Sequence, residues 1–358
     1  MRGGLTTCVL ACLLAGCEGG IGGTGGVAPP TAVDGGTGTI DVAGQATKGP
    51  FSEGSTVRYA QVMADGTRAS ATHLGETGTL GDFTGVIPAG VAEISVTGLY
   101  VSENLGVSSD TPMTLRSVWS GAGTANVNIL GHVTADRTRI LMSEGMGVLN
   151  AQSTAMAELT ESLRPVLSAP GTPLFASEVS VLRQFGSNPD GDAYLLTLSA
   201  IVERYALDQT TSTVDATQFL SIFLDGWADD LASDGLLDLD GELPGLRFAR
   251  SAIRPDEIYT NLLRADVRVT DQAEDGLGVS GDFRCEAVDG ELSCVELLAD
   301  AAPEPANDVL TVPLTDVLPD IERFLDTDGD GTPNDLDGDD DDDGVPDDGD
   351  VNRFDNTI

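Results

Sequence analysis

The first part of the chain alternates between apolar and polar residues with a period of two, over short runs that turn residues separate. Such runs occupy residues 40–42, 56–62, 91–96 and 126–129, with turn residues at 64–66 and 87–90. Short strands at this close spacing predict an antiparallel β-sandwich over residues 39–130.

After His132 the hydrophobic period lengthens toward 3.6 residues, which indicates helices. One stripe contains Met156, Leu159, Leu163 and Val166, and a second contains Leu195, Leu198, Ile201, Val202 and Tyr205. Asp215 and Gln218 are spaced as in a capping box, and Pro255 suits the start of another helix. We therefore predict a helical domain over residues 131–275, and we interpret its apolar stripes as core.

Two cysteines follow in a segment that we interpret as a β-hairpin, residues 276–300. Asp289-Gly290 is a favoured pair for a two-residue type I′ turn. Counting outward from this turn sets Cys285 opposite Cys294 as a non-hydrogen-bonded pair, with Cα atoms about 4.5 Å apart, within the range of a disulfide. We predict that disulfide. Zinc binding is the alternative, although two cysteines without a nearby histidine make a poor zinc site.

The charge of the chain limits its partners. The 358 residues include 58 acidic and 18 basic side chains, the net charge is −40, and Lys48 is the only lysine. Nothing supplies the cationic face that phosphate contacts require, so nucleic acid is excluded as a partner. Residues 326–358 contain 14 Asp and one Arg. Solubility or a salty habitat explains an acidic body, but it does not easily explain this tail.

The N-terminus has the parts of an export signal, because Arg2 precedes an apolar stretch from Leu5 to Leu14 that is too short to span a bilayer. The following Leu14-Ala15-Gly16-Cys17 resembles the lipobox of bacterial lipoproteins. That resemblance implies a signal peptide at 1–16 and a diacylglyceryl group on Cys17. Glu18 resembles the sorting residue of proteins sent to the outer membrane. An ordinary signal peptide with an incidental cysteine is the alternative.

Residues 17–38 are rich in Gly, Thr, Pro and Ala, so we predict that they form a flexible tether. Beyond the tether, Lys48-Gly49-Pro50-Phe51, residues 54–57 and residues 81–84 resemble carboxypeptidase-regulatory-like or prealbumin-like sandwich modules of bacterial surface proteins. This resemblance implies a spacer or binding scaffold that has no catalytic residues.

The chain has two histidines, His73 in a predicted strand and His132 at a predicted helix start. Neither belongs to a nucleophile, metalloprotease or phosphate-binding motif. Acidic pairs such as Asp238 and Asp240 are too common here to single out a catalytic pair. The sequence therefore predicts that the protein is not an enzyme. A deep pocket with convergent polar groups around either histidine would instead favour a ligand-binding or hydrolytic protein.

The tail repeats one pattern of aspartates with a period of thirteen residues. In the first copy, positions 1, 3, 5, 7, 9 and 12 of a calcium loop are Asp326, Asp328, Asp330, Thr332, Asn334 and Asp337; in the second they are Asp339, Asp341, Asp343, Val345, Asp347 and Asp350. Short carboxylates at alternate positions can reach one centre, the glycine at position 6 allows a sharp turn, and position 7 offers its carbonyl oxygen.

Residues 326–350 resemble the thrombospondin type 3 calcium repeat, which implies Ca²⁺ as the cofactor and the twelve residues above as its ligands. The closing ligand is Asp rather than the longer Glu, so we expect weak affinity, with a dissociation constant of roughly 10⁻⁴ to 10⁻³ M. The alternative is a solvated acidic run that never folds.

Together these patterns predict a multidomain α+β protein with a β-sandwich, a helical domain, a disulfide hairpin, a linker at 301–325, calcium repeats at 326–350 and a C-terminal end at 351–358. We expect an outer-membrane lipid anchor, a protein that faces the periplasm or the cell surface, and a structural, adhesive or binding role. Candidate partners are another surface protein or a glycan. The alternative is a ligand-binding or hydrolytic lipoprotein with a site between the sandwich and the helical domain.

Overall fold

A computed structural model describes residues 38–265 except 79, 183–185 and 187, then 283–288, 291–296, 309–313, 318–350 and 354. The predicted signal peptide, Cys17 and the tether up to residue 37 lie outside the described residues. The turn at 289–290 and all of the predicted C-terminal end except residue 354 lie outside them as well.

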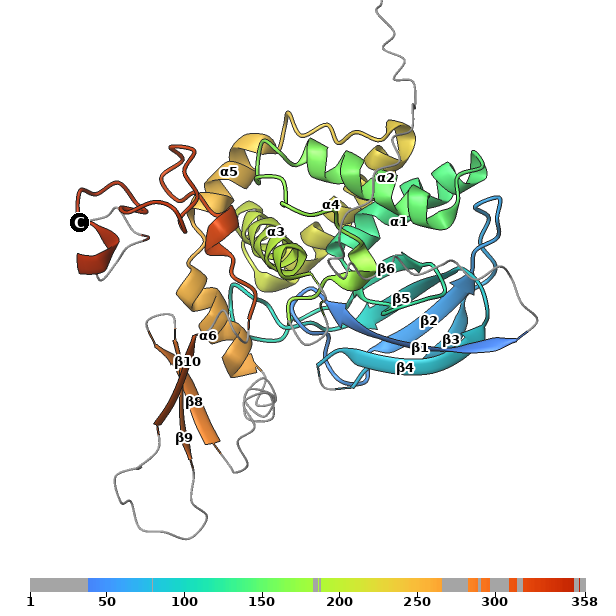
Figure 1. Ribbon diagram of the computed structural model, residues 1–358, viewed down its shortest axis with the longest axis horizontal. Helices are drawn as coiled ribbons and strands as arrows, with labels where there is room; N and C mark the ends of the chain where they lie inside the picture. The colour runs from blue at the N-terminus through green and yellow to red at the C-terminus, as the bar shows by residue number, and fades with distance from the viewer. Residues whose placement is uncertain are drawn as a thin grey trace, which may run out of the picture. The chain divides into compact units, whose positions relative to one another are not determined.

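Two β-sheets form the first half of the described chain (Figure 1). Their strands are β1 (Thr39–Thr47), β2 (Thr56–Gln61), β3 (Thr72–Glu76), β4 (Asp82–Pro88), β5 (Ala92–Gly98), β6 (Met113–Trp119) and β7 (Val127–Asn128). One sheet has the order β4-β1-β7 and the other β3-β2-β5-β6, with all pairs antiparallel except β1 with β7. Apolar residues of both sheets, among them Phe83, Ile94 and Leu115, belong to one buried cluster, so the predicted strands pack as two sheets.

Helices follow from residue 129, as the change of period predicts. They are α1 (Ile129–Ser143), α2 (Val148–Ser162), the 3-10 turn η1 (Ala176–Glu178), α3 (Pro189–Gln209), α4 (Thr213–Asp234), α5 (Leu243–Ser251) and α6 (Pro255–Ala265). Pro255 opens α6 as predicted. Within the described part of the chain, no helix is both long and apolar enough to cross a membrane.

The predicted cap of α4 is wrong. The helix begins at Thr213, and the Ser212 side chain accepts a hydrogen bond from the Asp215 N–H at 3.2 Å. Asp215 is therefore in the first turn, where a negative charge favours the positive end of the helix dipole. Ser212 is the N-cap because its side chain accepts from the free amide three residues further on.

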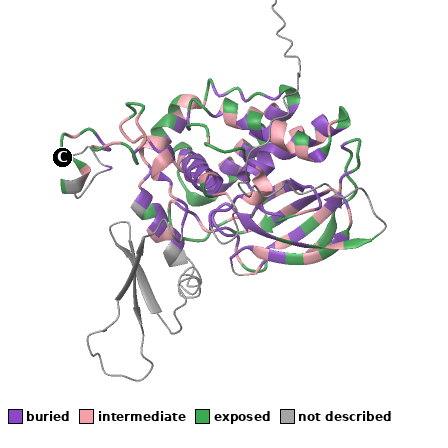
Figure 2. Ribbon diagram, in the orientation of Figure 1, coloured by how far each residue is buried: buried purple, intermediate pink, exposed green. Residues whose placement is uncertain are grey.

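The two sheets and the helices contribute to one large buried hydrophobic cluster, although the sequence predicts separate units. The buried cluster continues from Val127 on β7 through Ile129, Leu130 and Val133 on α1 to α3 and α4. Figure 2 shows buried residues on both the sheets and the helices. The physical reason is that β7 runs directly into α1 without a linker, so the change of secondary structure at residue 130 does not separate two cores.

Two parts of the region that we interpret as a linker, residues 301–325, contain secondary structure. Residues Val309–Pro313 form β10, which pairs with the hairpin strand β9. The segment from Leu318 to Leu325, which includes the 3-10 turn η3 (Glu322–Phe324), is tied to the helices. The Ile321 N–H donates to the Tyr259 hydroxyl at 3.0 Å, and the Phe324 ring meets Tyr194 edge to face at 5.5 Å. This segment fixes the start of the acidic tail.

The hairpin of β8 (Phe283–Val288) and β9 (Glu291–Glu296) has the predicted backbone register, with Cys285 opposite Cys294. The cysteine side chains lie outside the described residues, so the disulfide remains a prediction.

We expect mass spectrometry of non-reduced peptides to find Cys285 joined to Cys294, because opposed residues of a non-hydrogen-bonded pair are within disulfide distance. The reduced digest serves as the control. Alkylation of both cysteines without prior reduction would contradict the cross-link.

Candidate metal centre and ligand pockets

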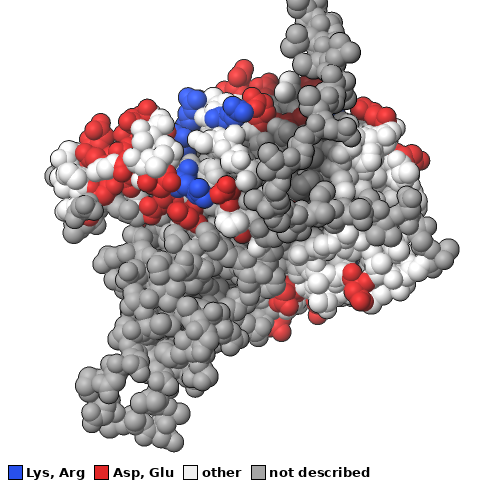
Figure 3. Space-filling model, in the orientation of Figure 1, with Lys and Arg blue, Asp and Glu red and all other residues white. Residues whose placement is uncertain are grey.

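The first acidic loop is anchored to the helical body at its first residue. The Asp326 Oδ2 lies 3.1 Å from the Arg250 Nη2 on α5, and just upstream the Arg323 Nη1 lies 2.6 Å from the Asp190 Oδ1 on α3. Figure 3 shows acidic side chains over the tail and basic side chains gathered beside them, around α5. The loop therefore starts from a fixed point.

Aspartate side chains curl the backbone of the first loop around themselves. Asp326 Oδ1 accepts from the Gly329 N–H at 2.8 Å, Asp328 Oδ1 from the Asp330 N–H at 2.9 Å, and Asp330 Oδ1 from the Thr332 N–H at 2.6 Å. These are local turns that Asp favours. One carboxylate oxygen from each of the three aspartates lies within 4.8 Å of the others, so the triad could hold a metal ion.

The second loop has the same bonds at positions 3 and 5, whereas its first aspartate accepts from position 6 rather than position 4. Asp341 Oδ1 accepts from the Asp343 N–H at 3.2 Å, and Asp343 Oδ1 from the Val345 N–H at 2.7 Å. Asp339 Oδ2 accepts from the Gly344 N–H at 3.1 Å. Asp339, Asp341 and Asp343 form the second triad that could hold an ion.

The backbone conformation also repeats at equivalent positions. Position 4 is left-handed in both loops, with φ of 81° at Gly329 and 54° at Asp342, and position 6 is left-handed at Gly331 and Gly344. Aspartate is among the few side chains that tolerate this region. The second loop thus adopts the same turn without glycine at position 4.

The residue at position 9, Asn334 or Asp347, joins the two ends of its loop by hydrogen bonds. The predicted ligand pattern does not include this role. The Asn334 N–H donates to the Leu325 carbonyl and its Oδ1 accepts from the Thr327 N–H at 3.0 Å. In the second loop the Asp347 N–H donates to the Gly338 carbonyl and its Oδ1 accepts from the Asp340 N–H at 3.0 Å. Asn334 and Asp347 are thirteen residues apart, and this recurrence is the signal in the sequence that indicates a shared role.

Three further carboxylates predicted as ligands, Asp337, Asp347 and Asp350, lie outside the two triads. Thr332, Asn334 and Val345, which would offer other oxygen atoms, stay predictions. Burial is the main cause that raises the pKa of Asp328 in the first triad. Repulsion from Asp330, Asp326 and Asp337 raises it further. A cation would relieve this repulsion among like charges.

A pocket of about 380 Å³ lies beside His132, between the outer face of the β3-β2-β5-β6 sheet and helices α1 and α4. Its polar side chains include Arg68, Glu93, Arg116 and Asp225. The His132 Nε2 lies 3.1 Å from the Asp225 Oδ1, and this contact lowers the pKa of Asp225. His73, by contrast, is exposed on β3. Polar groups from the sheet and from two helices therefore surround this pocket.

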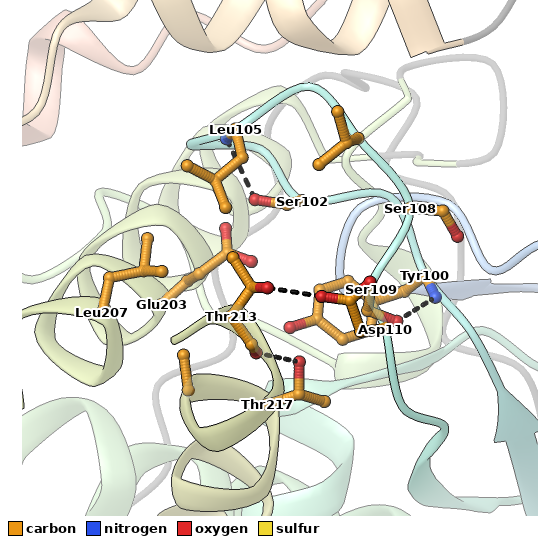
Figure 4. Close-up of a pocket in the computed structure, with 12 residues that line it drawn as sticks. Tyr100, Ser102, Leu105, Ser108, Ser109, Asp110, Glu203, Leu207, Thr213 and Thr217 are labelled. Atoms are coloured by element: carbon orange, nitrogen blue, oxygen red, sulfur yellow. Dashed lines mark hydrogen bonds between the residues drawn. The ribbon is translucent and has the colours of Figure 1, made fainter. Parts of the chain in front are cut away.

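A second pocket lies where the segment from Tyr100 to Asp110 meets α3 and α4 (Figure 4). It is small, about 50 Å³, and Thr213 donates to the Asp110 carboxylate at its edge. Glu203 lines it and leads to a buried charge cluster.

The only lysine of the chain is at the centre of that cluster. Lys48 is fully buried, forms an ion pair with Glu103, and places its Nζ 3.5 Å from the Glu203 Oε2 and 5.2 Å from the Tyr100 ring centroid. Ser199 donates to Glu103 at 2.6 Å, and the Asn104 amide donates to Glu203 at 3.0 Å. No local pattern predicts this role, because both glutamates are distant from Lys48 along the chain.

Two buried carboxylates lie beside one lysine here, and their pKa values shift in opposite directions. Burial raises the pKa of Glu103 by more than the nearby Lys48 lowers it. Burial also opposes ionisation of Glu203, but attraction to Lys48 and the hydrogen bonds from Asn104 outweigh it, and the pKa of Glu203 is lowered.

Comparison of the chain with models of known protein families, with curated proteins and with solved structures finds no match.

We expect Lys48→Met to lower the free energy of unfolding at pH 7 by about 3–5 kcal/mol, because it leaves buried carboxylates without a cation. Without Lys48, both folded-state pKa values rise above the unfolded ones. The deficit relative to the parent protein should therefore be largest at neutral pH and shrink as the pH falls toward 5. Urea unfolding at both pH values measures this.

Adding Glu203→Gln to Lys48→Met serves as the control and should restore part of the lost stability, since one uncompensated acid is removed. If Lys48→Met unfolds at the same urea concentration as the parent, the cluster does not stabilise the fold.

Proposed function

We propose that this chain is a calcium-binding lipoprotein, anchored in the outer membrane through Cys17, with a structural, adhesive or binding role toward another surface protein or a glycan. The observation that carries the proposal is the pair of Asp triads at a spacing of thirteen residues. Each triad offers hard oxygen ligands at alternate positions of a turn, which is the ligand type that Ca²⁺ prefers.

Calcium is favoured over magnesium by the geometry that the ligands allow. Carboxylates on a short, flexible loop suit the irregular coordination of Ca²⁺, whereas Mg²⁺ requires near-ideal octahedral geometry and keeps its waters. An ion in each loop would offset the repulsion within the triads. Since Asp326 is also held by Arg250, an ordered tail would stay joined to the helical body.

A second candidate function has its own support. The pocket beside His132, with charged groups from the sheet and from two helices, favours a ligand-binding or hydrolytic lipoprotein with its site between the sheets and the helices.

Calorimetric titration of the full-length protein in detergent should show calcium uptake with a dissociation constant of roughly 10⁻⁴ to 10⁻³ M. Asp328→Asn combined with Asp341→Asn removes one carboxylate from each triad and should weaken uptake about tenfold, because affinity follows the charge of the ligand set.

Asp335→Asn is the matched control, since it makes the same chemical change in the same tail outside both triads. If this control loses as much calcium affinity, or if magnesium binds equally well, the tail attracts cations through its overall charge and has no specific calcium site.

Cys17→Ala should move the protein from the membrane fraction to the soluble fraction of fractionated cells, because the acyl chains supply the anchor. Cys8→Ala, which lies within the predicted signal peptide, is the control and should leave the distribution unchanged. A Cys17→Ala protein that stays in the membrane fraction would rule out lipid anchoring at this residue.

A further inference from the structure

We propose that the pocket beside His132 binds a sugar-sized polyol that carries an oxyanion, such as an acidic sugar, with Arg116 and Arg68 as the groups that recognise the anion. The inference rests on the second candidate function and is independent of calcium.

The floor of this pocket is set by strand register. Ala60 pairs with Glu93 across β2 and β5, and Ser95 pairs with Arg116 across β5 and β6. Directly paired residues of neighbouring strands point to the same face of a sheet, so the four side chains share one surface. His132 on α1 and Asp225 on α4 form the opposite wall, together with Arg68 from the loop after β2.

Arg68 and Arg116 both line this pocket, and each also forms an ion pair with a carboxylate. Arg116 uses its Nη2 on Asp136 at 2.6 Å, and its side chain is 20% exposed. Arg68 is 41% exposed and pairs with Glu93, a buried carboxylate that Arg139 also approaches at 3.5 Å. In a chain of net charge −40, the two guanidinium groups that line this pocket, Arg68 and Arg116, balance its two lining carboxylates, Glu93 and Asp225.

Two buried nitrogen atoms at this pocket lack a hydrogen-bond partner among the described residues. They are the Nε of Arg116 and the Nδ1 of His132, whose side chain is only 4% exposed. Buried polar atoms are nearly always satisfied. The unpaired Arg116 Nε–H is a donor and points to a ligand that supplies an acceptor, whereas the His132 Nδ1 donates or accepts according to the tautomer of the ring. The planar guanidinium suits a carboxylate or phosphate in particular.

The rest of the lining defines the body of the ligand. Ser95, Thr114 and Ser221 offer hydroxyl groups, and the Asp225 side chain is 61% exposed and can accept hydrogen bonds from ligand hydroxyls. The apolar lining is limited to Ala60 and Ala71. Such a surface suits a strongly hydrated, hydroxyl-rich compound rather than an apolar one, and about 380 Å³ is ample for a monosaccharide.

The test uses the two histidines of the chain as reporters in NMR spectra of the full-length protein labelled at histidine. Sodium glucuronate, glucose 6-phosphate and glucose are titrated separately in the presence of a chelator. Glucuronate or glucose 6-phosphate should shift the His132 resonances while His73 stays unchanged, and glucose should bind at least tenfold more weakly. The preferred acid then identifies the oxyanion as a carboxylate or a phosphate.

Arg116→Gln should remove the preference for the acids over glucose, whereas Arg164→Gln, an exposed arginine at the end of α2, should keep it. If Arg116→Gln does not fold, Arg68→Gln tests the second guanidinium in the same way. Equal affinity for glucose and both acids overturns anion recognition but leaves the pocket as a binding site. An unmoved His132, or equal shifts at His73, overturns the inference, and a parallel calcium titration tests the leading function separately.

Discussion

The ion cluster around Lys48 is the constraint on which the join between sheets and helices depends. A buried cation needs its carboxylates close by, and these come from the loop after β5 and from α3. Neighbouring amides extend the join: Asn104 donates to the Ala200 carbonyl on α3, and Asn261 on α6 donates to the Glu103 carbonyl. A buried Lys48 without its carboxylates would destabilise the fold. The sheets and helices are therefore most stable in the arrangement that brings Lys48, Glu103 and Glu203 together.

That arrangement places helix α4 in the wall of both pockets. The small pocket borders the charge cluster through Glu203, and the larger one opens on the outer face of the second sheet beside α1 and α4. Strand register fixes the floor of the larger pocket, and the start of α1 is fixed by the Asn128 cap, whose side chain accepts the Gly131 N–H at 2.9 Å. His132 is the next residue, so its position follows from the cap.

Local patterns in the sequence predicted local features well. Strand alternation, the register of Cys285 opposite Cys294 and the start of α6 at Pro255 all depend on residues that are close in sequence, and they agree with the structure. The Asp triads could be foreseen for the same reason. The Lys48 cluster, the shared core and the gathering of Arg68, Arg116 and His132 depend on contacts across many residues, for which a single sequence contains no periodic signal. The segment at 318–325 contains four buried apolar residues, but it is short and follows a Pro- and Ala-rich stretch, so its docking could not be foreseen.

The two proposed sites have opposite charge preferences, and a chain of net charge −40 can support both. At physiological ionic strength, charges farther than about 8 Å are largely screened, so a ligand responds to the groups beside it rather than to the net charge. In the tail those groups are the carboxylate triads, with Arg250 holding the outer oxygen of Asp326. In the pocket they are guanidinium groups whose acidic partners, Glu93 and Asp136, are largely enclosed. An anion at the two guanidinium groups therefore meets donors, while the exposed Asp225 carboxylate of the same pocket is left for hydroxyl groups of the ligand.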